Sequence, residues 1–547
     1  MKAVKPVVDF LVSGGVKYIF GIPAGSVNAF FDELYERREI TPIVAKHEGA
    51  ASYMAAAYAR NSGQLGVCIG CSGPGSTNLL TGAANAMREQ LPVLFITGAV
   101  PTNTVGLNAS QELSVEPMYR PVTKYSVTVS KAEDLVKEAA KAVKIALSGI
   151  PGPVHVAMPI DLQLEQISSS ECPPFPSVEK ISPAKEDIAA LAGELLNRKK
   201  GVLFVGQGAR DAVPELLEVA ELLNWPIITT PQAKGLIPES HPLSKGIFGF
   251  AGHEEASLLI NEGARDVLFV IGSSLGETAT NNYNERLTAG RYVIQMDRDQ
   301  TVFGRKYPVD MTILGDSRES LMLLAVELRN RGLRPETKTF APFREISAPP
   351  ASEAYNTQNV LLKIQQSLPE TTRYTVDIGE FMSYVVHYMK VQTVHSFDIN
   401  VHFGAMGTAI GSAIGMSLAD SARPSACITG DGCFFMHGME ILTAKEYNLP
   451  ILFIVMNNAR LGMVYHGHAL QYKRVHERFE QQPVSIAKMA EAMDIPSYQI
   501  RSMGDIEEKE IQNLLDRKGP AVLEVSLVDN NIPPMGDRVK FLSSFGK

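Results

Sequence analysis

Two proline-rich stretches interrupt an otherwise regular alternation of short apolar runs and amphipathic helical patterns. They cover residues 168–183 and 337–353, carry no apolar periodicity and are typical of linkers. Strand-length runs alternating with helices are typical of a parallel sheet covered by helices on both faces. One large barrel would also give this alternation, but the two interruptions favour three separate sheets. We therefore predict an α/β fold with three doubly wound parallel-sheet domains, at residues 1–165, 185–335 and 355–530, and a tail at 531–547.

Strand candidates occur in all three segments. They occupy residues 67–70, 92–96, 153–158, 201–205, 226–229, 266–271, 292–297, 425–429, 451–457 and 521–526. Helical patterns such as 50–60 and 131–147 lie between them. The first and third segments share this pattern without a residue-level repeat, which predicts similar domains at the two ends of the chain.

Charge and hydropathy exclude several classes of function. A net charge of −8 and a pI near 5.9 argue against nucleic-acid binding, because phosphates select for clustered Lys and Arg. No run of about 18 apolar residues occurs, so we expect no transmembrane helix and no membrane partner. The N-terminal residues form an amphipathic pattern without the apolar core of a signal peptide, which predicts a cytoplasmic protein.

Cys68 and Cys71 form a C-x-x-C pair, a spacing found in redox and metal sites. They lie at the end of an apolar run, and neither a second such pair nor a pair of histidines accompanies them. We expect both to be small buried side chains without metal or redox chemistry.

The most informative motif is Gly430-Asp431-Gly432, which directly follows an apolar run. After 24 intervening residues, Asn457-Asn458 follows the next run. Both motifs are therefore expected at the carboxyl ends of neighbouring parallel strands, where open α/β sheets bind ligands. The glycines let backbone approach a phosphate, and the side-chain oxygens of Asp431 and Asn458 suit a Mg²⁺ that bridges a diphosphate. The backbone carbonyl of Arg460 is a candidate third ligand. The first motif alone could be a tight turn; the pair predicts a metal site.

With these residues the chain resembles the thiamine-diphosphate-dependent enzymes, and within them the acetohydroxyacid (acetolactate) synthase branch. Blocks of similarity occur in order at residues 21–25, 46–51, 72–82, 120–124, 151–163, 241–253 and 405–415, and at the two motifs above. The resemblance implies a pyrimidine-binding domain first, a central domain, and a diphosphate-binding domain last. It also implies a homodimer or homotetramer, because in that family each cofactor lies between the first domain of one chain and the third domain of another.

The resemblance assigns catalytic roles to Glu48 and Gln111. Glu48 matches the glutamate that hydrogen-bonds N1′ of the aminopyrimidine ring, and this favours the tautomer whose 4′-nitrogen removes a proton from C2. A free glutamate is ionised at neutral pH, so such a site must be dry enough to hold it protonated. Gln111 matches a glutamine near the thiazolium. Without the family, both would be interpreted as solvated polar residues.

Further residues match positions that contact the cofactor. Met406 matches the bulky residue that bends the cofactor, and the carbonyl of Gly404 matches an acceptor for the aminopyrimidine. Glu380 and Phe381 depart from the usual Gln-His. The predicted cofactor-binding set is Gly25, Glu48, Gly73, Pro74, Asn78, Ile378, Gly379, Gly404, Met406, Gly430, Asp431, Gly432, Cys433, Asn458, Gly462 and Met463.

Four departures from the synthase pattern concern the substrate. Thr278 stands where the synthases place an arginine that binds the acceptor carboxylate, and Gly467 replaces a tryptophan that selects the acceptor. Ser110 replaces a phenylalanine, and Ser26 occupies a further pocket position. Losing the arginine should disfavour a 2-oxo acid acceptor. The segment that contacts FAD is altered as well, although residues 206–208 keep their Gly-Gln-Gly, so we expect no FAD.

We interpret the protein as a carboligase that decarboxylates a 2-oxo acid, with pyruvate as the expected donor, and transfers the resulting acyl carbanion equivalent to an acceptor. One alternative is a simple 2-oxo acid decarboxylase that releases an aldehyde. Such enzymes carry a His-His pair in the loop that here spans residues 106–110, where no histidine occurs; His47, His437, His466 and His468 are the other candidates for proton transfer. A second alternative is a non-catalytic paralogue, against which the intact Glu48, Asp431 and Asn458 argue.

Overall fold

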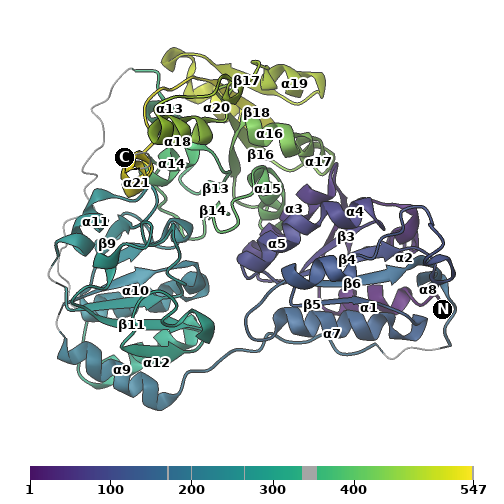
Figure 1. The fold of residues 1–547 in the computed structure, drawn as a ribbon, viewed down its shortest axis with the longest axis horizontal. Coiled ribbons are helices and arrows are strands. Elements are labelled where there is room, and N and C mark those ends of the chain that lie inside the picture. Colours follow the sequence, from purple (N-terminus) through teal and green to yellow (C-terminus); the bar gives the residue numbers. More distant parts are fainter. Residues whose placement is uncertain (169–171, 199, 264, 336–353, 545–547) are drawn as a thin grey trace.

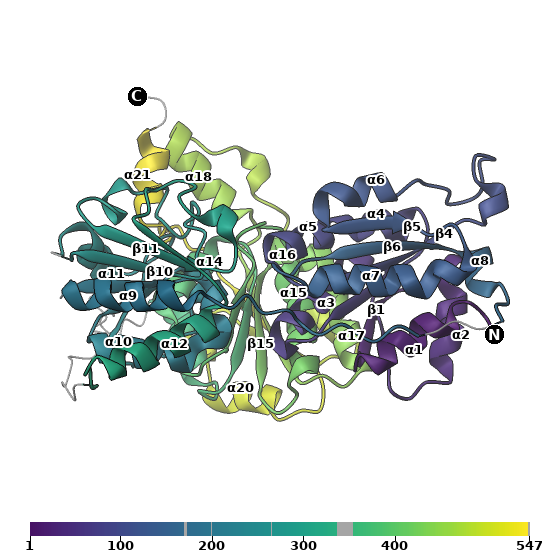
Figure 2. The ribbon, with the colours of Figure 1, turned by 90° about the horizontal axis from the view of Figure 1, so that it is seen from below.

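The computed structural model describes residues 1–168, 172–198, 200–263, 265–335 and 354–544. They form three lobes, each built around a six-stranded sheet whose paired strands are all parallel (Figures 1 and 2). The predicted α/β fold of three parallel-sheet domains is confirmed. Within the described residues, 168–184 hold neither helix nor strand, and the second predicted linker lies outside the described part.

The first sheet has the strand order β2-β1-β3-β4-β6-β5. Its strands are β1 (Tyr18–Gly21), β2 (Thr41–Val44), β3 (Gly66–Gly70), β4 (Val93–Ala99), β5 (Tyr125–Thr128) and β6 (Val154–Pro159). Its helices are α1 (Lys5–Ser13), α2 (Asn28–Tyr35), α3 (Glu48–Ser62), α4 (Pro74–Asn78), α5 (Leu80–Arg88), α6 (Glu116–Tyr119), α7 (Leu135–Leu147) and α8 (Ile160–Leu164). Cys68 and Cys71 are buried free thiols in and just after β3, as expected.

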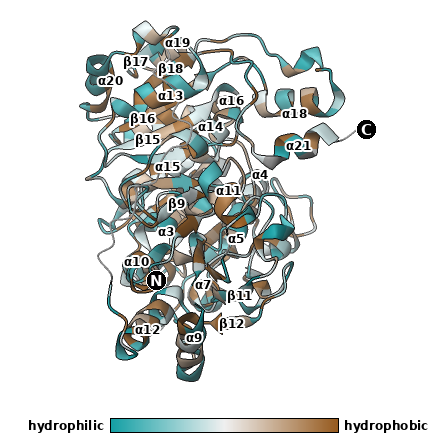
Figure 3. Ribbon diagram, turned by 90° about the vertical axis from the view of Figure 1, so that its left-hand side faces the viewer, coloured by the Kyte–Doolittle hydropathy of each residue, from teal (hydrophilic) through white to brown (hydrophobic). Residues whose placement is uncertain are grey.

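The central sheet has the order β12-β11-β10-β7-β8-β9. Its strands are β7 (Gly201–Val205), β8 (Ile227–Thr229), β9 (Ser244–Ile247), β10 (Val267–Ile271), β11 (Tyr292–Asp297) and β12 (Met311–Leu314). Helices α9 (Lys185–Asn197), α10 (Val213–Leu223), α11 (Glu254–Asn261) and α12 (Ser317–Asn330) cover it. The outward helices α9 and α12 carry hydrophilic and hydrophobic residues side by side (Figure 3), as helices do when one face packs on a sheet.

The third sheet has the order β14-β13-β15-β16-β18-β17. Its strands are β13 (Arg373–Val376), β14 (Phe397–Ile399), β15 (Ser425–Gly430), β16 (Ile451–Asn457), β17 (Ser497–Ile500) and β18 (Ala521–Ser526). Its helices are α13 (Thr357–Gln366), α14 (Glu380–Tyr388), α15 (Thr408–Ala419), α16 (Asp431–His437), α17 (Ile441–Glu446), α18 (Gly462–Tyr472), α19 (Ile486–Ala492) and α20 (Glu508–Leu515). The tail contains a further helix, α21 (Asp537–Ser544), which packs against α18.

The first and third sheets have the same topology. Numbered within each domain, both read 2-1-3-4-6-5, whereas the central sheet reads 6-5-4-1-2-3. In each sheet the chain reverses its direction of winding beside the first strand: between β1 and β3, between β7 and β10, and between β13 and β15. Ligands of open α/β sheets bind at the carboxyl ends of strands at such switch points, so the fold offers three candidate positions.

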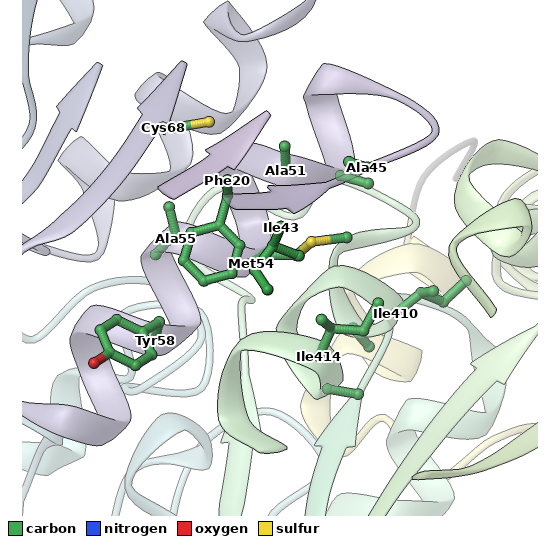
Figure 4. Close-up of a cluster of buried hydrophobic side chains, with 14 of the residues drawn as sticks. Phe20, Ile43, Ala45, Ala51, Met54, Ala55, Tyr58, Cys68, Ile410 and Ile414 are labelled. Carbon is green, nitrogen blue, oxygen red and sulfur yellow. The ribbon is translucent and has the colours of Figure 1, made fainter. Parts of the chain in front are cut away.

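Helix α3 of the first domain packs against α15 of the third domain (Figure 1). Two glycines of α15 allow this close approach. A Cβ on Gly411 would lie 2.7 Å from the Ala50 carbonyl oxygen, and one on Gly415 would lie 2.2 Å from that of Met54. Apolar side chains on both helices close the contact, and Figure 4 shows Met54 of α3 near Ile410 and Ile414 of α15. The two domains therefore share one hydrophobic core.

No helix in the described part of the chain is long and apolar enough to cross a membrane.

Candidate active site

A cavity of about 210 Å³ opens at the switch point of the third sheet. The segments that follow β13, β15 and β16 meet there, together with residues 404–406 and the start of α18. Its walls include every third-domain residue that the sequence assigned to the cofactor or metal. These are Ile378, Gly379, Gly404, Met406, Gly430, Asp431, Gly432, Cys433, Asn458, Arg460, Gly462 and Met463.

The cavity is lined by glycine backbone where larger residues would collide. A Cβ on Gly379 or Gly430 would lie 2.3 or 2.9 Å from the ring of Phe381. No loop residue separates β15, which ends at Gly430, from α16, which begins at Asp431. Backbone amides at the first turn of α16 thus border the cavity directly, an arrangement that suits an anion such as a phosphate.

Asp377 is buried next to Ile378 of the cavity wall and joins three segments of the third domain. One carboxylate oxygen accepts from the backbone amides of Ile378 and Gly407 at 2.9 Å each, and the other accepts from the Thr429 hydroxyl at 3.0 Å. Burial raises the pKa of Asp377 to about 6. Asp377 was not among the predicted site residues, because no strand was predicted at residues 373–376, which it directly follows. Its contacts fix the segment that carries Met406.

The predicted metal ligands lie at the carboxyl ends of adjacent strands. Asp431 follows β15 and Asn458 follows β16, and these strands pair in parallel through Gly430 and Met456. Asp431 Oδ1 accepts from the Gly432 amide at 2.8 Å, and Asn458 Oδ1 accepts from the Arg460 amide at 3.1 Å. Burial raises the pKa of Asp431 to about 6. A carboxylate, a side-chain amide oxygen and backbone carbonyls form a donor set that fits Mg²⁺.

Glu380 and Phe381, the two residues that depart from the family pattern, are buried at the cavity wall. Phe381 packs on Gly379 and Gly430, and Glu380 begins α14 with its side chain buried. The Glu380 carboxylate accepts from Asn458 Nδ2 at 2.6 Å and lies 3.2 Å from His466 Nε2. Its space exists because residue 462 is glycine: a Cβ there would lie 2.1 Å from Glu380 Oε2.

The first-domain candidates gather at the switch point of their own sheet. Asn78 Nδ2 donates to Glu48 Oε2 at 2.9 Å, where α3 begins. Ser72 donates from its amide to Ser26 Oγ at 2.9 Å and from its hydroxyl to the Gln111 carbonyl at 2.8 Å. Gly73 has φ +67° and would meet the Gln111 carbonyl if it carried a Cβ. Gly25 and Ser26 lie in a short 3₁₀ turn, residues 25–27, and Pro74 begins α4.

The first-domain candidates do not line the third-domain cavity. None of Gly25, Glu48, Gly73, Pro74, Asn78 or Gln111 lines the third-domain cavity. That cavity is also smaller than the ~300–1,000 Å³ usual for cofactor sites. Within one chain, the first-domain candidates and this cavity are therefore separate groups.

The candidate histidines differ in their surroundings. His47 caps α3, accepting at Nδ1 from the Gly49 amide, and its ring lies 5.4 Å from that of His437. His466 is buried beside Glu380, whereas His468 Nδ1 lies 2.5 Å from the Arg474 carbonyl. Of the four, His466 is the nearest neighbour of a residue that lines the cavity.

The four acceptor positions are spread over the three domains. Ser26 and Ser110 belong to the first domain, and Gly467 lies on α18 with no atom within 4 Å of a Cβ built on it. Thr278 accepts from Gln232 Nε2 at 3.1 Å, beside a different cavity of about 310 Å³ at the central switch point. This central cavity includes Gly206, Gln207 and Gly208. In a single chain, the structure does not bring the four positions together.

Three α/β domains with cofactor-type half-sites on the first and third define a class of enzyme that binds a diphosphate cofactor between domains. Comparison with known families identifies it. The N-terminal, central and C-terminal domain models of the thiamine pyrophosphate enzymes match residues 1–118, 188–324 and 377–525. The chain belongs to the thiamine pyrophosphate enzyme family, close to its acetolactate synthase branch.

Curated relatives match over nearly the whole chain. The "Probable acetolactate synthase large subunit" of Methanocaldococcus jannaschii is 31% identical, over 98% of this chain and 93% of its own length. The "Acetolactate synthase isozyme 1 large subunit" of Escherichia coli K12 is 28% identical, over 97% and 94%. A solved structure, of "a putative thiamin diphosphate-dependent enzyme" from Mycobacterium smegmatis, shares the fold with a TM-score of 0.83 at 21% identity, over 97% of this chain and all of that one.

Replacing Asp431 by alanine should remove the one anionic ligand that the two motifs supply. We expect thiamine diphosphate binding in the presence of Mg²⁺ to weaken by about 100-fold, or ~3 kcal/mol. Isothermal titration calorimetry measures this directly. Asp494→Ala is the matched control, since that side chain is 94% exposed on the same domain. If Asp431→Ala binds thiamine diphosphate as tightly as wild type, Asp431 is not a metal ligand.

Proposed function

We propose that this protein is a thiamine-diphosphate-dependent carboligase that decarboxylates a 2-oxo acid and joins the acyl fragment to a carbonyl acceptor. The observation that carries the proposal is the third-domain cavity, in which a glycine-lined wall and two oxygen ligands follow adjacent strands. Curated relatives of nearly equal length that are named acetolactate synthases support the reaction class.

Mg²⁺ would be held by Asp431 Oδ, Asn458 Oδ1 and the Arg460 carbonyl, and the diphosphate by the backbone near Gly379 and Gly430. When bound, thiamine diphosphate supplies a carbon centre that adds to the 2-oxo acid and accepts the electron pair released with CO₂. Met406 and Gly404 line the same cavity and would orient the ring system.

Glu48 would hold a proton at the aminopyrimidine. It is largely buried at the start of α3, and Asn78 donates to one of its carboxyl oxygens, which fixes the direction of the other. A buried carboxyl held in one orientation can donate to a ring nitrogen and exchange a proton there. Gln111, whose carbonyl is tied to Ser72, would lie on the acceptor side of the same site.

The working unit would be at least a dimer. Glu48 and Asp431 belong to separate half-sites of one chain, so a complete site needs the first domain of a second copy. Exposed apolar side chains support such a contact: Leu107 and Leu113 flank Gln111, and Phe435, Met436 and Met439 lie on and after α16.

Glu48→Gln should preserve folding and cofactor binding while lowering turnover by about 10²–10⁴-fold, because glutamine cannot exchange the proton. Glu39→Gln, an exposed change in the same domain, is the control. Co-refolding Glu48→Gln chains with Asp431→Ala chains tests the shared site: random dimers would restore about one site in four. Turnover of Glu48→Gln within threefold of wild type, or no activity from the mixture, would contradict the respective assignment.

The acceptor is proposed to be bulkier or less acidic than a second small 2-oxo acid. Thr278 offers no cation for an acceptor carboxylate, and Gly467 leaves open space on α18 where the synthases have an indole. An unpaired desolvated carboxylate costs about 2–4 kcal/mol in discrimination.

Steady-state kinetics with pyruvate, alone and with 2-oxobutyrate, aldehydes or bulkier ketones, tests the proposal. We expect CO₂ release with pyruvate, and the highest kcat/KM for carboligation with an acceptor other than a small 2-oxo acid. Gly467→Trp should lower kcat/KM for the bulky acceptors by about tenfold, since it fills the open space. Efficient acetolactate formation from pyruvate alone would overturn the acceptor proposal, and acetaldehyde as the sole product would identify a decarboxylase.

We further propose that the protein purifies without FAD. The reason is the altered segment at residues 273–278, which ends at Thr278 beside the central cavity. The absorbance spectrum of protein expressed with excess riboflavin is the measurement. Flavin absorbance near one equivalent per chain would contradict the proposal.

A further inference from the structure

Asn458 carries a side chain whose two ends have opposite chemistry, and only its oxygen can bind a cation. Its Nδ2 donates to Glu380 Oε1 at 2.6 Å, and its Oδ1 accepts from the Arg460 amide at 3.1 Å. An ionised carboxylate can only accept, and a backbone amide can only donate. Both contacts therefore favour one orientation of the Asn458 amide group, with Nδ2 toward Glu380 and Oδ1 toward the Arg460 amide.

Glu380 is itself fixed in place. Its side chain is buried, and its second oxygen lies 3.2 Å from His466 Nε2 and 3.6 Å from Arg460 Nη2. On the other side, the carboxylate occupies the space that Gly462 leaves open, where a Cβ would lie 2.1 Å from Oε2. The carboxylate thus has nitrogen groups at both oxygens, Asn458 at one and the His466–Arg460 pair at the other.

We propose that Glu380 is a positioning residue for the metal site: it holds Asn458 so that Oδ1, and not Nδ2, is directed to the cation. This inference rests on the proposed function, because it concerns the Mg²⁺ that accompanies thiamine diphosphate. Glu380 acts through Asn458. Its charge also lies close to Asp431 and adds to the attraction for a cation.

The substitution Glu380→Gln would reverse the orientation of the Asn458 amide group. Arg460 can only donate hydrogen bonds, so the oxygen of the new side chain would turn to its guanidinium and the amide nitrogen would then face Asn458. Asn458 would have to offer Oδ1 to that nitrogen and turn Nδ2 towards the cation. Adding Asn458→Asp removes this conflict, because both oxygens of an aspartate side chain accept hydrogen bonds. The double variant, Glu380→Gln with Asn458→Asp, would therefore satisfy every contact and still direct an oxygen to the cation.

The experiment titrates Mn²⁺ into protein saturated with thiamine diphosphate, and electron paramagnetic resonance counts the free ion. Four proteins are compared: wild type, Glu380→Gln, the double variant Glu380→Gln with Asn458→Asp, and the exposed control Glu370→Gln. We expect Glu380→Gln to weaken Mn²⁺ binding by about tenfold or more, and the double variant to return within about threefold of wild type. Thermal unfolding midpoints, measured on all four, should stay close together.

The outcomes separate the two proposals. If wild type binds no Mn²⁺ with thiamine diphosphate, the proposed function fails and this inference fails with it. If wild type and Glu370→Gln bind normally, two results overturn the inference alone. One is a loss below about threefold in Glu380→Gln, and the other is no gain from adding Asn458→Asp. A purely structural role of Glu380 would lower the unfolding midpoint, and Asn458→Asp would not restore metal binding.

Discussion

The contact between α3 and α15 is the constraint on which the placement of both half-sites depends. Gly411 and Gly415 bring the backbones of the two helices into direct contact, so neither helix can shift without a collision or a void. Glu48 begins α3, and the segment with Met406 leads directly into α15. The packed pair of helices therefore links Glu48 of the first domain to the Met406 segment of the third domain.

The far end of α3 meets all three domains in a buried electrostatic junction. Arg60 contacts Glu89 at 2.7 Å and also Asp398 of β14, and Arg210 of the central domain donates to Asn61 at 3.1 Å. Buried charges are costly unless paired, so this junction contributes to a unique arrangement of the domains more than to net stability. Glu89 also borders the central cavity. A ligand in that cavity would therefore lie near Glu89, which belongs to the junction at the end of α3.

Much of the fold follows from the sequence pattern, and much of the site from the family resemblance. Every predicted strand is present, because fully buried parallel strands such as β7 and β16 are continuous apolar runs. Strands such as β2 and β5 were not predicted; both lie at sheet edges and are only partly buried, so their residues carry little signal. The tail helix α21 was missed for a similar reason, since it is short and mostly polar.

Within the site, the sequence predicts the candidate metal ligands, but it does not predict the residues that hold them in place. Asp431 and Asn458 follow apolar runs at a recognisable spacing, which the sequence displays directly. Asp377 could not be assigned a role, because its three contacts come from segments up to 52 residues apart. Glu380 was visible only as a departure from the pattern. The role proposed for Glu380 depends on whether it contacts the oxygen or the nitrogen of the Asn458 side chain. Only the folded structure shows this.

The charge of the third-domain cavity affects how it can hold a diphosphate. Among the described residues that line it, Asp431 and Glu380 are acidic and Arg460 is the one with a permanent positive charge. The Arg460 guanidinium is already engaged, donating to Asn530 and to the Asp529 carbonyl and lying over the Tyr465 ring. A bare diphosphate would thus meet two carboxylates in a partly dehydrated space, where like charges repel far more strongly than in water. A divalent cation held by Asp431 would offset that repulsion. Glu380, where the family pattern has glutamine, supplies the second of the two carboxylates and would increase the need for such a cation.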